Sequence, residues 1–303
     1  MEMHAGSSSK RRVRLLLPVA LGSTLALAAA ACSSKTSSAP PLTPRQAVLA
    51  SVTSTESASS AALSLSVSVH GVLSLGGSTT SGSTTGKTIS LDITGHGAFS
   101  FVNKTGDLTL DIPLLGQGSA GTVEIEQVGG QIYVSTPKLT SVDGGKQWVS
   151  FTLAGFQQEV GSSDPLISLA DGNPTATLGL LESLTGTVTE AGKTDIDGVP
   201  TTEYQADLNL AHPTTSSTII SSALAQTLGL SSVPVDVWVD SAGRARQVST
   251  TFSVLGLTVT AQVGLNSFGS PVSVTAPPAD EVVPGSALLQ GGQLGSVFGS
   301  VLP

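Results

Sequence analysis

Side chains that could catalyse a reaction or bind a metal are few in this sequence of 303 residues. Cys32 is its one cysteine, which excludes a disulfide framework and any cysteine-rich zinc or iron–sulfur site. Of the four histidines, His70, His96 and His212 are isolated from one another and lack the spacing of metal ligands. We therefore expect no metal site, and the sequence indicates no cofactor.

Paired carboxylates are the other groups that could do chemistry. Glu124 and Glu126 are two residues apart, as are Asp195 and Asp197, so on a strand each pair would share one face. A glycosidase needs such a pair with one pKa raised by apolar surroundings. Because these carboxylates alternate with apolar residues, we expect them on a solvated face, where they would be structural and not catalytic.

Motifs for nucleophilic catalysis and nucleotide binding are also missing. The sequence has no G-x-S-x-G nucleophile elbow. Residues 83–88 resemble a phosphate-binding loop, but Ser81 stands where that motif requires glycine, and Thr88 begins an alternating strand pattern instead of a helix. We expect no catalytic residue and a protein that is not an enzyme.

The N-terminal segment predicts export and lipid anchoring. Cations at 10–14 precede a charge-free apolar run over 15–31, the anatomy of a secretory signal peptide. Its 17 residues are also the short limit for a spanning helix, so a retained membrane helix is the alternative. Small residues directly before Cys32 resemble the bacterial lipobox, in which the cysteine is acylated. We predict a signal peptide over 1–31 and lipidation of Cys32.

The chain is acidic, with a formal net charge of -8 and a pI of about 4.8. Without the four signal-peptide cations and Glu2, nine Lys and Arg remain against 20 Asp and Glu, a formal charge of -11. This balance disfavours nucleic acid as a partner and broad contact with anionic lipid headgroups. The predicted acyl anchor would therefore have to hold the protein at the membrane.

The rest of the chain reads as one α+β domain dominated by strands. Residues 32–42 are a Ser/Thr/Pro-rich tether, and Thr43 with Pro44 predicts a helix that runs to about Ser57. From Leu63 onward apolar residues alternate with polar ones, which predicts antiparallel sheet. We place this domain at 43–280 and a mobile Gly/Leu/Ser-rich tail at 281–303. Further strands are expected near 89–101, 108–112, 123–125, 132–134, 187–189, 194–196, 202–208, 233–240, 244–254, 257–265 and 272–275, with Asp197-Gly198 as a turn, two short helices or turns within 164–182 and an amphipathic helix at 216–228.

A family resemblance covers roughly residues 44–278. Residues 193–204, 233–240 and 243–246, in that order, resemble the LppX/LprAFG family of actinobacterial lipoproteins, which is related in fold to the LolA/LolB-like periplasmic lipoprotein carriers. The resemblance implies a strongly curved, half-barrel antiparallel sheet with helices on its concave face and an apolar cavity. It further implies that the protein binds acylated lipids or glycolipids and transfers or presents them in the cell envelope.

The residue pattern alone leaves two outcomes open for such a sheet: a filled core, or a sheet curled around a ligand cavity. Our first hypothesis is a lipid-binding lipoprotein at the outer face of the cytoplasmic membrane. The alternative is a non-catalytic envelope binding or sensor module with a filled core. A membrane transporter is a candidate partner in both. Candidate cavity residues, which are core residues on the alternative, are Phe99, Phe101, Leu108, Leu110, Ile219, Ile220 and Leu224.

Overall fold

A computed structural model describes residues 41–73, 86–113, 120–137, 139, 145–152, 178–210 and 229–290. The chain divides into two compact units, residues 1–41 and 42–303, and all elements described below belong to the second. Several sequence-based predictions lie outside the described residues: the signal peptide at 1–31, Cys32, nearly all of the tether 32–42, the helix at 216–228, and most of 164–182.

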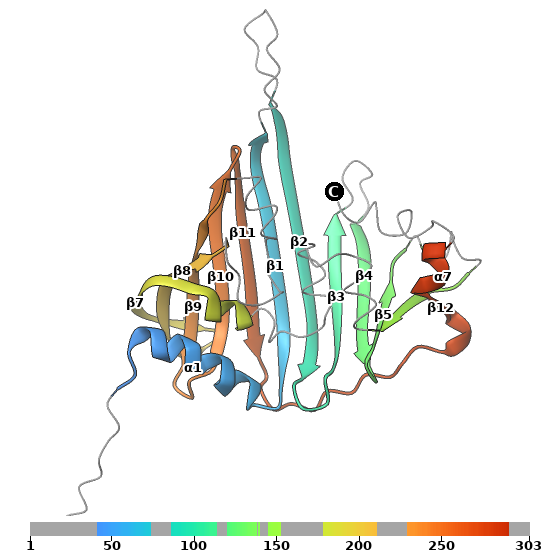
Figure 1. The fold of residues 1–303 in the computed structure, drawn as a ribbon, viewed down its shortest axis with the longest axis horizontal. Coiled ribbons are helices and arrows are strands. Elements are labelled where there is room, and N and C mark those ends of the chain that lie inside the picture. Colours follow the sequence, from blue (N-terminus) through green and yellow to red (C-terminus); the bar gives the residue numbers. More distant parts are fainter. Residues whose placement is uncertain are drawn as a thin grey trace, which may run out of the picture. The chain divides into compact units, whose positions relative to one another are not determined.

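Twelve strands form one open, curved sheet in the order β12-β6-β5-β4-β3-β2-β1-β11-β10-β9-β8-β7 (Figure 1). All neighbouring strands pair antiparallel except β12, which runs parallel to β6. This architecture confirms the predicted fold class. The elements are α1 (Pro44–Glu56), β1 (Ser60–Leu73), β2 (Lys87–Ser100), β3 (Thr105–Pro113), β4 (Ala120–Val128), β5 (Gln131–Ser135), β6 (Trp148–Thr152), η1 (Leu180–Ser183), β7 (Leu184–Ile196), β8 (Val199–Asn209), β9 (Ser232–Asp240), β10 (Ala245–Val254), β11 (Leu257–Asn266), η2 (Ala279–Glu281), β12 (Val282–Pro284) and α7 (Gly285–Gln290).

The sheet consists of two arms that meet in its middle. In the N-terminal arm, β1 to β6 pair in chain order, and β12 and α7 join its outer end. In the C-terminal arm, β7 to β11 also pair in chain order, with α1 and η1 packed on them. The arms join where β1 pairs with β11, for example at Leu63 opposite Leu265. This junction brings together segments about two hundred residues apart in sequence.

Strand alternation gives the sheet one apolar and one polar face. In β3 the buried residues Leu108, Leu110 and Ile112 alternate with more exposed ones, and the valines of β9 follow the same pattern. Because successive side chains of a strand point to opposite faces, every second residue is buried. We call the face that carries these buried side chains the apolar face.

Helix α1 begins and ends where the sequence predicts. Thr43 and Gln46 form a capping box, in which each side chain satisfies a backbone N–H of the first turn, and Pro44 occupies the first helical position. The helix buries Val48 and Val52 against the C-terminal arm, where it contacts β7, β9, β10 and η1. Its position therefore covers the apolar face of that arm.

Two sequence-based predictions near the C-terminal end of the domain are wrong. The strand expected at 272–275 does not form: residues 270–278 have neither helix nor strand, and Pro271, Pro277 and Pro278 provide no N–H for a ladder. The predicted mobile tail begins too early, because β12 pairs with β6 and Leu288 of α7 is fully buried. Residues 291–303 lie outside the described residues.

None of the described helices has the length and hydropathy that a membrane-spanning helix requires.

Candidate functional site

The largest feature of the described unit is its apolar face, which carries two clusters of buried side chains. One lies under the C-terminal arm and includes Val48 and Val237, and the other lies under the N-terminal arm and includes Ile125 and Ile132. The clusters meet at the junction of β1 and β11, where Leu63 packs against both. The apolar surface is therefore continuous across the two arms.

The two arms differ in what packs on this face. Helix α1 lies along the C-terminal arm (Figure 1), whereas α7 packs at the outer end of the N-terminal arm, against β6 and β12. The intervening strands β2 to β5 contribute a large apolar set to the same face. This set comprises Ile93, Leu108, Leu110, Ile112, Val123, Ile125, Ile132 and Val134, all buried.

Three of the seven residues predicted from strand and helix pattern to contact a ligand lie on the apolar face. Phe99, Leu108 and Leu110 are buried there. Phe101 follows the end of β2 and is partly buried, with its ring 5.8 Å from that of Phe99. The structure thus brings the two phenylalanines together, but Phe101 packs against the cluster of the C-terminal arm, whereas Leu108 and Leu110 belong to that of the N-terminal arm. Ile219, Ile220 and Leu224, as well as the predicted lipidation site Cys32, lie outside the described residues.

Sequence reasoning missed two polar residues on the apolar face of the N-terminal arm. Gln127 and Thr136 are buried, with 6% and 4% of their surface exposed. The Gln127 Oε1 and the Thr136 Oγ1 have no hydrogen-bond partner in the described part of the chain. The signal was present in β4, because Gln127 occupies the register of the buried Val123 and Ile125. A polar residue in an apolar register is either paired or available to a ligand.

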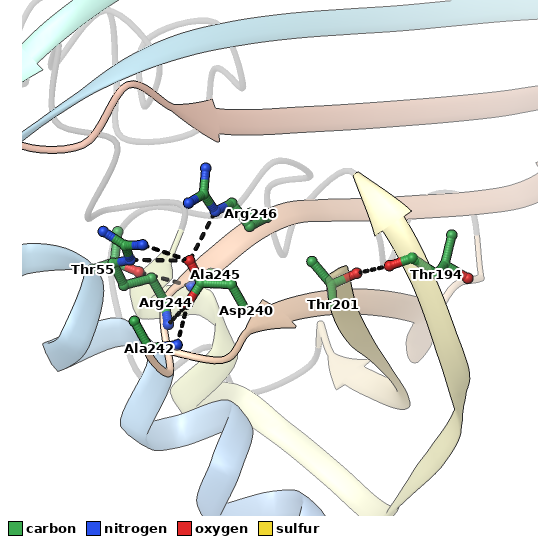
Figure 2. A network of polar contacts seen from close by, with 8 residues as sticks. All are labelled: Thr55, Thr194, Thr201, Asp240, Ala242, Arg244, Ala245 and Arg246. Carbon is green, nitrogen blue, oxygen red and sulfur yellow. Dashed lines mark hydrogen bonds and ion pairs between the residues drawn. The ribbon is translucent and has the colours of Figure 1, made fainter. Parts of the chain in front are cut away.

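A second polar group, at the turn between β9 and β10, is fully paired (Figure 2). The Asp240 carboxylate accepts hydrogen bonds from the backbone N–H groups of Ala242 and Arg244, and from the Nε atoms of Arg244 and Arg246 at 3.0 and 2.9 Å. Both guanidinium groups also lie over the Phe268 ring, 4.6 and 4.7 Å from its centroid. This network closes the β9–β10 hairpin.

The electrostatics of this network favour charged Asp240. Burial alone would raise the pKa of Asp240, but hydrogen bonds from Arg244 and Arg246 and the charge of Arg244 outweigh it and lower the pKa. The backbone N–H of Ala245 donates to the Thr55 hydroxyl of α1. This hydrogen bond ties α1 to the C-terminal arm next to the Asp240 network, so both have a structural role.

The carboxylate pairs behave differently from each other. Asp195 and Asp197 are exposed, as expected. The prediction of a solvated pair is wrong for Glu126, whose Oε2 is buried without a partner among the described residues. Burial, together with the negative charges of Glu124 and of Asp107 on the neighbouring strand, raises the pKa of Glu126. The sequence could not reveal this because Asp107 approaches Glu126 only through strand pairing.

No group of three or more His, Cys, Asp or Glu residues in the described ranges could hold a metal ion. His70 lies at the exposed end of β1, where its Nε2 is 3.0 Å from Asp92 Oδ1 and its Nδ1 is 3.1 Å from Ser90 Oγ. His96 is exposed on the polar face, and His212 lies outside the described residues.

Comparisons with known proteins give structural neighbours at low sequence identity. No family model and no curated protein matches the sequence. Solved structures similar to the chain include LprF from Mycobacterium bovis, with 16% identity and a TM-score of 0.44, covering 78% of this chain and 97% of LprF. The lipoprotein LppX from Mycobacterium tuberculosis has 17% identity and a TM-score of 0.37, covering 76% of this chain and 98% of LppX. A DUF1329 family protein from Desulfovibrio piger has 10% identity and a TM-score of 0.30; the match covers 77% of this chain and 96% of that protein. LprF and LppX bear the names of the family that the sequence resembles, and the chain is similar to both.

Proposed function

We propose that this protein is a membrane-anchored lipoprotein that binds acylated lipids or glycolipids on the apolar face of its N-terminal arm. It would transfer or present these lipids in the cell envelope without catalysing a reaction. One observation carries the proposal: strands β2 to β5 contribute a broad buried apolar set, while α1 packs on the other arm and α7 at the outer end of this one.

The physical basis is burial of acyl chains. Each methylene that leaves water gains about 0.8 kcal/mol, so a surface such as that formed by Leu110, Ile125 and Ile132 can hold a lipid chain without polar contacts. Specificity would then come from a few polar groups near the headgroup.

The predicted anchor provides the location. Acylation of Cys32 would place the protein at the outer face of the cytoplasmic membrane, where its lipid ligands and a partner transporter would be found. With a formal charge of -11 from Cys32 onward, the mature chain would depend on its acyl chains and not on basic residues for membrane contact.

A second candidate function is a filled-core binding or sensor module of the envelope. The observation that favours it is the complete burial of Val48, Ile132 and Val149, since fully buried aliphatic residues are typical of an ordinary core. On this alternative the apolar face would be satisfied by the chain itself.

Native mass spectrometry distinguishes the two candidates. The chain from Ser33 onward, which retains every described element, is purified from an actinobacterial host and weighed under native and then denaturing conditions. The proposal predicts a stoichiometric acylated lipid that is released on denaturation. Bare protein under both conditions would overturn the proposal and favour the filled-core module.

Matched tryptophan substitutions locate the site. Ile125→Trp in the N-terminal arm should lower the fraction of protein that carries lipid. Val237→Trp in the C-terminal arm should leave that fraction unchanged and destabilise the fold by about 1–3 kcal/mol through overpacking. Retention of lipid by Ile125→Trp in a folded protein would contradict the assignment to the N-terminal arm.

A further inference from the structure

Gln127 is a buried amide on the side of β4 that otherwise carries apolar side chains. Its side chain points to the apolar face in register with Val123 and Ile125. The Gln127 Oε1 is shielded from solvent and has no hydrogen-bond partner among the described residues. Since native proteins pair the large majority of buried polar atoms, a partner from outside the described fold would complete this site.

The strand neighbours of Gln127 offer no such partner. Gly106 stands opposite it on β3 and Ile132 on β5. Gly106 has no side chain, and a Cβ atom built there would lie 2.5 Å from Cδ2 of Phe99, so the Phe99 ring occupies that place. The amide therefore lies between an aromatic ring and the fully buried Ile132, neither of which carries a polar side-chain atom.

We infer that Gln127 selects the polar group of the bound lipid, and that this group is a neutral hydrogen-bond donor, a hydroxyl or an amide N–H, attached to an acyl chain. The inference rests on the proposed lipid-binding function and adds to it the class of headgroup. The acyl chain would lie along the neighbouring apolar side chains of Phe99, Ile125 and Ile132.

The chemistry of the amide oxygen determines this class. A carbonyl oxygen accepts hydrogen bonds, so its partner must donate one. A free carboxylate or a phosphodiester has no proton to donate, and it would bring a further negative charge into an acidic protein. An ammonium group also donates, but burying its charge among apolar side chains without an opposite charge is costly. A hydroxyl or an amide N–H donates without adding charge and would relieve the cost of the unpaired acceptor.

Thr136 provides an internal comparison because its hydroxyl is also buried without a partner in the described part of the chain. Since Ser135 pairs with Glu124, Thr136 lies beside Val123, four residues along β4 from Gln127. At about 3.3 Å per residue this separation is roughly 13 Å along the strand. A headgroup bonded to Gln127 would therefore not reach Thr136.

The test compares two neutral lipids that share a palmitoyl ester and differ in hydroxyl groups. The full chain, extracted in a mild detergent at fixed concentration, is titrated with 1-monopalmitoylglycerol and with methyl palmitate, and bound lipid is measured by native mass spectrometry. Gln127→Leu should weaken binding of monopalmitoylglycerol about tenfold, the loss expected for one buried hydrogen bond. Binding of methyl palmitate should change by less than about twofold, because it has no proton to donate.

Controls make the result specific. Thr136→Val should leave both affinities unchanged, and Gln127→Met provides an unbranched apolar replacement should the leucine variant fail to fold. An equal loss for both lipids, or a loss of discrimination in Thr136→Val in place of the Gln127 variants, would overturn the inference while lipid binding stands. Wild-type protein that binds neither lipid would overturn the proposed function itself, and the inference with it.

Discussion

The two arms of the sheet differ in how they treat buried polar groups. In the C-terminal arm and α1, the buried polar side chains are paired within the fold: Ser51 donates to the Val48 carbonyl, Thr55 accepts from Ala245, Thr201 donates to the Thr194 carbonyl, Thr250 donates to the Pro234 carbonyl, and Asp240 is held by Arg244 and Arg246. In the N-terminal arm, Ser60 donates to the Ser270 carbonyl and Ser100 accepts from the Asn103 backbone N–H, but on the apolar face Gln127 Oε1 and Thr136 Oγ1 have no partner among the described residues.

This difference is the one expected if the N-terminal arm holds the proposed lipid and the C-terminal arm is an ordinary core. An arm whose polar groups are internally satisfied gains rigidity and needs no other molecule. A buried acceptor without a partner, such as Gln127 Oε1, is the group that the proposed lipid headgroup would satisfy, whereas Thr136 lies too far along the strand to contact the same headgroup. The comparison favours the N-terminal arm as the site and the C-terminal arm as its support.

The strongest test of the C-terminal arm is Asp240→Ala. Because this substitution leaves Arg244 and Arg246 without their carboxylate, it should lower the free energy of unfolding by about 3 kcal/mol. Urea denaturation measures the effect. The exposed pair of His70 and Asp92 serves as the control, since Asp92→Ala should cost less than about 1 kcal/mol. Equal losses in the two variants would show that the Asp240 network contributes no more than a surface ion pair.

The same threonine-to-valine substitution should affect stability differently in the two arms. Thr250→Val removes the donor to the Pro234 carbonyl and should destabilise the protein by about 1 kcal/mol. Thr136→Val removes a hydroxyl that has no partner among the described residues, so stability should stay unchanged or rise by up to about 1 kcal/mol. Both are measured by urea denaturation of lipid-free protein. Comparable destabilisation by the two variants would abolish the contrast between the arms.

The arms should also respond differently to pH. The raised pKa of Glu126 means that its charged form destabilises the fold above the ordinary pKa of 4.5, and that this cost is absent below 4.5, where the carboxyl is protonated in both states. Glu126→Gln should therefore stabilise the protein at pH 7, by less than about 1 kcal/mol because solvent screens the site. The gain should disappear below pH 4.5.

Asp240 has the opposite dependence. Its lowered pKa contributes stability above the ordinary value of 3.8, and this contribution is lost as the pH falls through the folded-state pKa.

For the Glu126 prediction, a stability gain from Glu126→Gln that persists unchanged at pH 4 would show that this substitution acts through packing and not through charge.

The smallest effect is expected at the tip of the β10–β11 hairpin. Leu255 is 64% exposed and has a φ of 53°, followed by Gly256 at 79°. A turn with two positive φ values prefers Asn-Gly, so Leu255→Asn should stabilise the protein by about 0.5 kcal/mol. The melting temperature measures the gain. A lower melting temperature would indicate that Leu255 makes a contact that its exposure does not reveal.

Local pattern predicted much of the fold but only part of the candidate site. The capping residue Thr43, the alternation of β3 and the Asp197-Gly198 turn each follow from neighbours in sequence, and the structure confirms them. The pattern also placed Phe99, Leu108 and Leu110 on the apolar face. It could not show that Gln127 is unpaired, because pairing depends on which residues stand opposite it on β3 and β5.

The sequence by itself determined the apolar register of the strands and where α1 begins, because these depend on period and adjacency. The signal segment and the lipidation of Cys32 stay predictions, since both lie outside the described residues. Only the tertiary structure decided that β1 joins β11, that β12 joins β6, and that Asp240 gathers Arg244 and Arg246 beside α1. The periodicity of a strand identifies the face to which a side chain points, but not the residue that lies across the ladder. Long-range strand pairing therefore decides which buried polar groups are satisfied and which have no partner among the described residues.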